Sequence, residues 1–229
     1  MSKTVIEAVI FDMDGLMIDT EPMYKTALQE TARQFGYEME DAFFYQLVGL
    51  PNTACKKVIA GKMGPGFPLD EFWAWWPGIW KTEARKNGID KKSGLDEFLS
   101  WLSGTGLPAA VATSSTRKQA SFSLEAAGVD YPFEHIVTGD DVKHGKPEPD
   151  IYIETAERLG VPARNCAALE DSENGVRAAS SAGMLTIMIP DLKQPGPEVR
   201  NEADYILNSL HEARDILSEL HGQYSKSSK

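Results

Sequence analysis

The sequence predicts an α/β protein with a doubly wound parallel sheet and an inserted helical domain. Three observations lead to this fold class. Short apolar, β-branched runs recur along the chain, helical patterns separate the later runs, and one long stretch interrupts this alternation. With 229 residues, the chain is long enough for one α/β domain and a smaller second domain.

The apolar runs are the expected strands. Each is short, lacks regular alternation of apolar and polar residues, and is therefore expected to be buried on both faces of a parallel sheet. The runs are Val5–Phe11, Leu107–Ala112, His135–Thr138, Cys166–Leu169 and Leu185–Ile189.

The expected helices of the core lie between the later runs, and a glycine follows each of them. These helices cover residues 116–127, 151–159 and 173–182. A last helix is expected to begin at Ser209, where Glu212 completes a capping-box pattern.

The stretch from Ile18 to Lys92 breaks the alternation and has the pattern of several helices, one of them from Pro22 to Phe35. We expect residues 18–92 to form a helical cap domain, and residues 1–17 and 93–229 to form the α/β core. Aromatic residues gather in this stretch, and we expect most of them to form its own core, although they could also wall a ring-shaped ligand. They are Phe72, Trp73, Trp75, Trp76 and Trp80, with Pro77 expected to interrupt their helical spacing.

Composition excludes several classes of function. The net charge of −11 argues against a nucleic-acid partner and against binding to an anionic membrane. Cys55 and Cys166 lack the spacing of a zinc knuckle or a disulfide framework, and the first apolar run is too short for a signal peptide or a spanning helix. We therefore expect a cytoplasmic protein; the oligomeric state stays open.

Polar residues occur where the expected strands end, and the carboxyl ends of the strands in an open α/β sheet face one crevice. Asp12 and Asp14 follow the first run. One carboxylate can attack while the other handles protons, although paired aspartates after a strand are as often turn formers.

Three further groups follow later runs. Thr113-Ser114-Ser115 opens the next expected helix and offers a hydroxyl and N–H groups to an anion, or it is an ordinary N-cap. Lys146 lies in GKPEPD, where two prolines constrain the backbone, although a solvated loop lysine is the alternative. Glu170 and Asp171 bind a hard cation or cap the next helix, and capping does not easily explain both acids.

The segments FDMDGLMIDTE, VATSS, GKPEPDIY and LEDSENGVRAASSAGM resemble the successive motifs of the haloacid dehalogenase (HAD) superfamily, in its capped phosphatase and β-phosphoglucomutase-like branch. The resemblance covers nearly the whole chain and implies a HAD-like Rossmannoid core with an inserted helical cap. It also implies a Mg²⁺-dependent phosphatase that hydrolyses small phosphate monoesters, such as sugar or nucleoside phosphates, through an aspartyl-phosphate.

The resemblance also implies roles for single residues. Asp12 would be the nucleophile and Asp14 the acid that protonates the leaving oxygen and later activates water. Thr113 and the N–H of Ser114 would hold the phosphoryl oxygens, while Lys146 would offset their negative charge.

The implied metal site contains Asp12, the main-chain carbonyl of Asp14, and Asp171, with Glu170 close by or holding a metal-bound water. Charge alone demands a cation here, because two like unit charges 4 Å apart repel by about 4 kcal/mol at an effective dielectric constant of about 20. Mg²⁺ and Lys146 would together cancel the repulsion between Asp12 and a phosphate.

A β-phosphoglucomutase is the main alternative. Mutases that resemble this chain carry a His near the position of Tyr24 and an Arg near Asn52, and none of the four histidines lies within residues 18–92. We therefore favour hydrolysis. A signalling receiver domain would be about half this length, a dehalogenase would lack Asp14, and the GxGxxA of Gly104–Ala109 precedes a strand, unlike a dinucleotide site.

Overall fold

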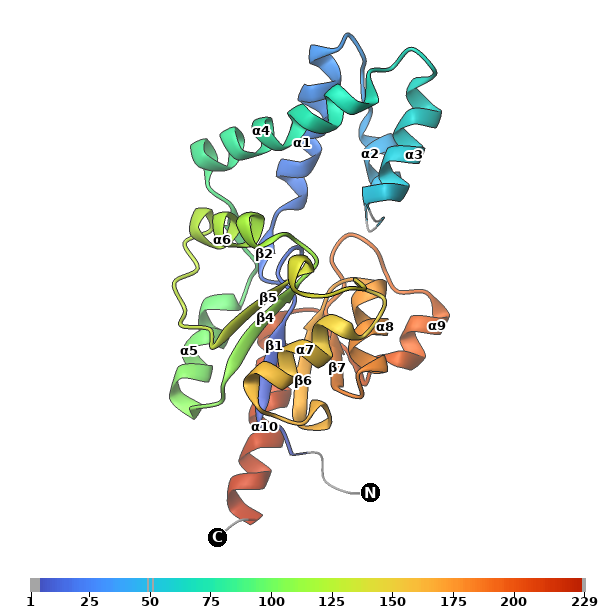
Figure 1. The fold of residues 1–229 in the computed structure, drawn as a ribbon. Helices are drawn as coiled ribbons and strands as arrows, with labels where there is room; N and C mark the ends of the chain where they lie inside the picture. The colour runs from blue at the N-terminus through green and yellow to red at the C-terminus, as the bar shows by residue number, and fades with distance from the viewer. Residues whose placement is uncertain (1–4, 49, 51, 228–229) are drawn as a thin grey trace. The chain divides into compact units, whose positions relative to one another are not determined.

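The computed structural model describes residues 5–48, 50 and 52–227. The chain divides into two compact units, one formed by Met1–Asp19 with Lys91–Lys229 and the other by Thr20–Asp90. The first unit contains a six-stranded sheet, and the second consists of helices (Figure 1). The helical unit is two residues shorter at each end than the insertion expected from the sequence.

The sheet of the first unit has the strand order β5-β4-β1-β6-β7-β8, and all its neighbours are parallel. β1 lies in the middle, later strands are added on both sides of it, and the predicted doubly wound sheet is thereby confirmed. The strands are β1 Ala8–Phe11, β4 Ala109–Thr113, β5 His135–Thr138, β6 Cys166–Glu170, β7 Leu185–Met188 and β8 Tyr205–Ile206.

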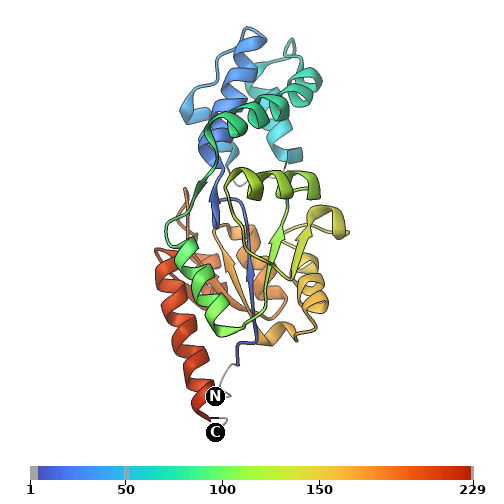
Figure 2. The ribbon, with the colours of Figure 1, turned by 90° about the vertical axis from the view of Figure 1, so that its left-hand side faces the viewer.

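Helices cover both faces of this sheet. α7 and α8 pack on one face, while α5 and α10 lie against each other on the opposite face (Figure 2). The helices are α5 Leu95–Thr105, α6 Arg117–Ala126, α7 Asp150–Leu159, α8 Glu173–Ser181, α9 Pro197–Glu202 and α10 Leu210–Ser227. The helices expected between strands are present within one residue of their expected starts.

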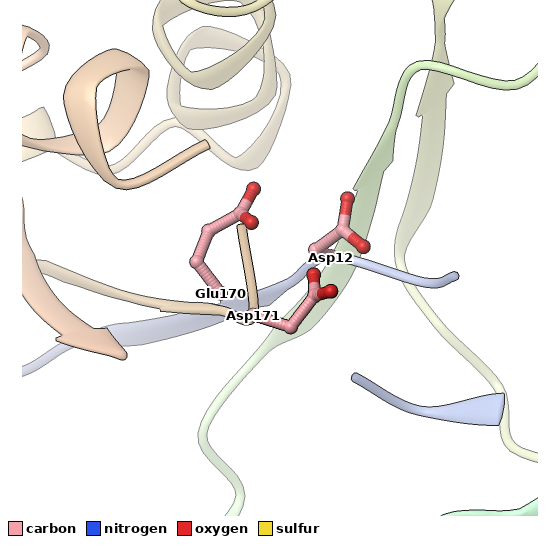
Figure 3. Close-up of side chains that lie close together, drawn as sticks. All are labelled: Asp12, Glu170 and Asp171. Atoms are coloured by element: carbon pink, nitrogen blue, oxygen red, sulfur yellow. The ribbon is translucent and has the colours of Figure 1, made fainter. Parts of the chain in front are cut away.

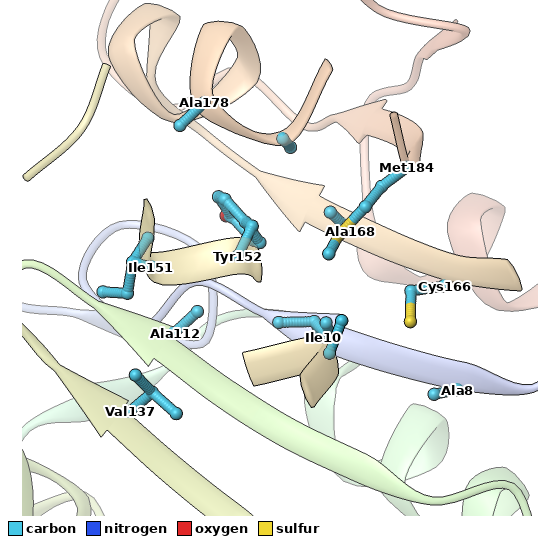
Figure 4. Close-up of a cluster of buried hydrophobic side chains, with 12 residues drawn as sticks. Ala8, Ile10, Ala112, Val137, Ile151, Tyr152, Cys166, Ala168, Ala178 and Met184 are labelled. Atoms are coloured by element: carbon cyan, nitrogen blue, oxygen red, sulfur yellow. The ribbon is translucent and has the colours of Figure 1, made fainter. Parts of the chain in front are cut away.

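One hydrophobic cluster joins the sheet to α7 and α8 (Figure 4). Tyr152 and Ile151 of α7 pack over Ala112 and Ala168, whose small side chains let the helix approach the strands closely. Tyr152 is fully buried, which requires a hydrogen-bond partner for its hydroxyl.

The helical unit contains α1 Glu21–Gln34, α2 Asp41–Leu47, α3 Asn52–Met63 and α4 Leu69–Asn87. The expected interruption at Pro77 is wrong, since α4 continues through it. Its continuity puts Phe72, Trp76 and Trp80 on one buried face, four residues apart, whereas Trp75 is 56% exposed. Three of the five aromatic residues therefore belong to the core of the helical unit.

Two short strands, β2 Ile18–Asp19 and β3 Asp90–Lys91, pair where the chain passes from one unit to the other. Nothing in the sequence pattern predicted them. Among the described residues, no helix combines the length and the apolar character needed to span a membrane.

Candidate active site

Strand pairing brings the predicted site residues together at the carboxyl end of the sheet. Phe11, the last residue of β1, lies opposite Val111 of β4 and Leu169 of β6. The N–H of Asp12 then donates to the carbonyl of Leu169 at 3.0 Å. Residues that directly follow β1 and β6 therefore lie side by side, as the sequence predicted.

Three carboxylates meet at this edge (Figure 3). One oxygen from each of Asp12, Glu170 and Asp171 lies within 4.8 Å of the other two. Glu170 is fully buried, Asp12 is 7% exposed and Asp171 is partly exposed. Buried carboxylates at this spacing repel one another strongly unless cations accompany them.

Lys146 supplies one such cation. Its side chain is only 5% exposed, and Nζ lies 2.5 Å from both Asp12 Oδ1 and Glu170 Oε1. Nζ also donates to the carbonyl of Ala112 at 3.0 Å. Burial alone would lower the pKa of Lys146, but the two carboxylates outweigh it and raise that pKa, so the lysine is charged. The alternative of a solvated loop lysine is wrong.

The single lysine does not neutralise the cluster. Burial raises the pKa of Asp12 to about 8, because Lys146 offsets only part of the effect and Glu170 adds to it. Burial and the charges of Asp12 and Glu170 also raise the pKa of Asp171 well above its ordinary value. A site of oxygen ligands with excess negative charge suits a hard divalent cation.

Glu170 is held by several donors. Its Oε1 accepts from the hydroxyl of Tyr152 at 2.6 Å as well as from Lys146, and its Oε2 accepts from Ser172 Oγ at 3.1 Å. Helix α8 packs directly beneath it: a Cβ added to Gly175 would lie 1.9 Å from Glu170 Cδ. Glu170 is consequently fixed in one position.

Neither acid caps α8. Ser172 does so, since its Oγ accepts from the N–H of Gly175 at 3.1 Å. This removes the capping alternative for Glu170 and Asp171, and both carboxylates are left to the cluster.

Asp14 lies in the turn that follows β1. Gly15 continues this turn with φ +87°, and a Cβ there would lie 2.4 Å from Asp171 Oδ2. Both the positive φ and the close approach of Asp171 require glycine. Asp14 Oδ2 accepts a hydrogen bond from Ser115 Oγ at 2.9 Å.

The Thr-Ser-Ser segment differs from the expectation that it opens a helix. α6 begins at Arg117, and Thr116 caps it by accepting from the N–H of Gln119. Thr113 is instead the buried last residue of β4, and Ser114 is exposed in the loop after it. Ser114 and Ser115 are therefore loop residues at the edge of the site, because the extended backbone of Thr116 delays the first helical turn.

Sequence reasoning missed several residues around the site. Besides Tyr152, they include Asp191 and Lys92, whose Oδ1 and Nζ atoms lie 2.7 Å apart. Ser115 belongs to the expected Thr-Ser-Ser segment, but its hydrogen bond to Asp14 was not expected. Asp191 follows the end of β7. The rule that selected the other strand-end acids would have selected it, whereas the tyrosine and the lysine carry no comparable signal.

The family assignment rests on the sequence that spans this site. The family model for haloacid dehalogenase-like hydrolase matches residues 9–189, which include Asp12, Lys146, Glu170 and Asp171. The chain belongs to this family. The resemblance predicted from the four motifs is confirmed.

Individual members of the haloacid dehalogenase-like family agree with this assignment. The chain is 32% identical over 184 residues to the phosphorylated carbohydrates phosphatase of Thermotoga maritima, covering 80% of this chain and 84% of that protein. The crystal structure of CbbY from Rhodobacter sphaeroides in complex with phosphate has a TM-score of 0.77 and 27% identity, covering 91% of this chain and 96% of that one. The family model and the phosphatase of Thermotoga maritima confirm the prediction of an enzyme, a phosphoric monoester hydrolase.

A β-phosphoglucomutase (pgmB) from Clostridium difficile is similar in structure as well. Its TM-score is 0.76 at 21% identity, with coverage of 96% of this chain and 99% of that one. At this identity the likeness shows the shared haloacid dehalogenase-like fold alone.

Proposed function

We propose that this enzyme is a Mg²⁺-dependent phosphatase that hydrolyses small phosphate monoesters through an aspartyl-phosphate on Asp12. The observation that carries the proposal is the position of Asp12, whose carboxylate pairs with the cation of Lys146 and lies within 4.8 Å of the carboxylates of Glu170 and Asp171. The name of the Thermotoga relative favours phosphorylated carbohydrates as the substrate class, with nucleoside phosphates as a further possibility within the same chemistry.

Asp12 is the nucleophile in this proposal. Lys146 occupies its Oδ1, so Oδ2 attacks phosphorus while the bond from phosphorus to the leaving oxygen breaks. Asp14 gives its proton to the leaving oxygen. It then takes a proton from the water that attacks the phosphoaspartate, which releases inorganic phosphate and restores Asp12.

The residues present fit Mg²⁺. Asp12, Asp171 and the main-chain carbonyl of Asp14 would hold it, with Glu170 alongside, and these are the oxygen donors that Mg²⁺ prefers. When bound, Mg²⁺ cancels charge that Lys146 leaves uncompensated and stabilises the transferring phosphoryl group. The donors already bonded to Glu170 support a role in fixing Lys146 beside the metal rather than a position as its main ligand.

Phosphate binding is assigned to Thr113, the N–H of Ser114 and Lys146. These groups lie beside Asp12 or at the end of β4, at the same edge of the sheet. They offer one hydroxyl, one amide and one cation to an anion. Residues 18–92 would act as the cap that selects the substrate. We also propose a cytoplasmic location, because both Cys55 and Cys166 are free thiols.

The test is phosphate release from a panel of sugar and nucleoside monophosphates, with Mg²⁺ and with a chelator. Asp12→Asn should fold normally and lose more than about 99% of turnover, since the amide keeps the shape but not the attacking charge. Asp130→Asn, the same change at an exposed aspartate, is the control. Turnover of Asp12→Asn within a few-fold of wild type, or full activity with the chelator, would contradict the proposal.

The mutase alternative is separated by a second assay. Glucose 6-phosphate formed from β-glucose 1-phosphate is measured beside phosphate release, with and without glucose 1,6-bisphosphate. Tyr24 packs against Trp76 and stacks on Trp80 at 5.5 Å between ring centroids, an environment typical of a core aromatic; the side chain of Asn52 lies outside the described residues. Phosphate release should exceed isomerisation, and bisphosphate-stimulated isomerisation that outruns release would favour the mutase.

A further inference from the structure

Ser115 stands out because its hydroxyl links the loop after β4 to the turn after β1. Its Oγ donates to Asp14 Oδ2 at 2.9 Å, across a sequence separation of 101 residues. We propose that Ser115 is a positioning residue that fixes the carboxyl group of Asp14 for proton transfer. This inference rests on the proposed function and deepens it.

The backbone of Ser115 is held from both sides. Its N–H donates to Thr113 Oγ1 at 3.1 Å, and its carbonyl accepts from the N–H of Gly139 at 3.0 Å. The loop also packs tightly against the start of the next turn, since a Cβ on Gly139 would lie 2.6 Å from the carbonyl oxygen of Ser114. The position of the Ser115 hydroxyl is thus set by β4 and by the segment after β5.

The backbone of Asp14 is equally constrained. Asp14 forms a bridge with Ile18, and the N–H of Gly15 donates to the carbonyl of Ile18 at 2.9 Å. The hydrogen bond from Ser115 to Oδ2 restrains rotation of the Asp14 side chain, so that Oδ1 is the oxygen that exchanges a proton with the substrate.

Ser115 has no part in capping the next helix. Thr116 performs this task with Gln119, whose side chain in turn accepts from the N–H of Thr116. A serine hydroxyl that is not needed for the helix but is directed at a carboxylate is explained by its effect on that carboxylate.

The substitution Ser115→Ala tests the inference with two substrates. General acid catalysis matters when the leaving group is a sugar alkoxide and matters little for nitrophenolate, which leaves without protonation. We expect kcat for a sugar phosphate to fall about tenfold, part of the factor of about 10² to 10⁴ that positioned proton transfer contributes. For nitrophenyl phosphate we expect a change of less than about threefold, with KM for both substrates unchanged, because the inference gives Ser115 no contact with phosphate.

Two further variants and one control sharpen the test. Ser115→Thr retains a hydroxyl and should restore sugar-phosphate turnover, whereas Ser121→Ala, at an exposed position of α6, should behave as wild type. Adding Ser115→Ala to Asp14→Asn should produce no further loss, because a residue that acts through Asp14 has nothing left to position.

Four outcomes would overturn the inference: wild-type turnover of the sugar phosphate by Ser115→Ala, equal losses on both substrates, a KM raised for both, or additive losses in the double variant. Raised KM values would show instead that the hydroxyl binds phosphate. A wild-type enzyme that released no phosphate would overturn the proposed function together with this inference, whereas an active wild type with an unaffected Ser115→Ala would overturn the inference alone.

Discussion

Gly175→Ala is expected to destabilise the protein although it improves a helix. Gly175 lies in the first turn of α8, where alanine is normally favoured over glycine by about 0.5–1 kcal/mol. A Cβ at this position would lie 1.9 Å from Glu170 Cδ and 2.0 Å from both of its carboxylate oxygens. The methyl group and the Glu170 carboxylate therefore cannot keep their places together.

The stability lost when Glu170 is displaced exceeds the stability gained from the higher helix propensity of alanine. Glu170 is fully buried, and moving it away separates it from Lys146 Nζ at 2.5 Å and from the Tyr152 hydroxyl at 2.6 Å. Breaking a buried ion pair costs about 3–5 kcal/mol. After the gain in helix propensity is subtracted, we expect the free energy of unfolding to fall by about 3 kcal/mol, with phosphatase activity lost because Lys146 loses its second carboxylate.

Urea unfolding followed by circular dichroism measures this difference. Gly61→Ala is the matched control, because Gly61 lies inside α3 with no atom within 4 Å of its added Cβ. That variant should be equally stable or up to about 1 kcal/mol more stable than wild type. An unfolding free energy of Gly175→Ala within about 0.5 kcal/mol of wild type would refute the packing of Glu170 against α8.

Three other predictions concern the same core. Tyr152→Phe should lower the free energy of unfolding by about 2 kcal/mol, the range for a hydrogen bond to a charged group, while Tyr45→Phe at an exposed site should not; equal stabilities would contradict the role of the Tyr152 hydroxyl. Asp141 has a pKa of about 2, because hydrogen bonds from Thr138 and the nearby Arg158 and Arg117 outweigh the effect of its burial. The ionised form of Asp141 therefore adds about 2 kcal/mol to the free energy of unfolding above pH 4, and this contribution is lost as the pH falls towards 2. Asp141→Asn should show that deficit in urea unfolding at pH 7, keep about half of it at pH 3 and lose most of it at pH 2; a deficit independent of pH would argue against the linkage. Mg²⁺ should raise the melting temperature of wild type and of Asp130→Asn, but not of Asp171→Asn, and an undiminished rise in Asp171→Asn would exclude it as a ligand.

The strand ends could be predicted because the chemistry is local there. Asp12, Lys146 and Glu170 each follow or face an apolar run, and parallel strands bring their carboxyl ends to one edge whatever the details of packing. Helix Leu95–Thr105 also carries a local signal, since its buried residues Leu95, Phe98, Leu99 and Leu102 have helical spacing.

Other features depended on contacts that no local pattern encodes. The hydrogen bond between Ser115 and Asp14 arises only when two segments 101 residues apart meet. β8 has two residues, too few for any periodicity. The burial of Trp76 and the exposure of Trp75 follow from a helix that continues through Pro77, which tertiary packing permits and intrinsic propensity opposes.

The central place of β1 has a consequence for synthesis of the chain. Val9 pairs with Ala109 on one side and with Ala167 on the other, so β1 is synthesised long before either of its partners. At about 5–20 residues per second, the wait for β6 lasts roughly 8–30 s after β1 has been made. During that time the apolar strand lacks at least one of its two neighbours and is exposed to wrong pairing. The nascent protein therefore stays inactive and vulnerable until β6 has emerged, when the nucleophile and its acidic partners first come together.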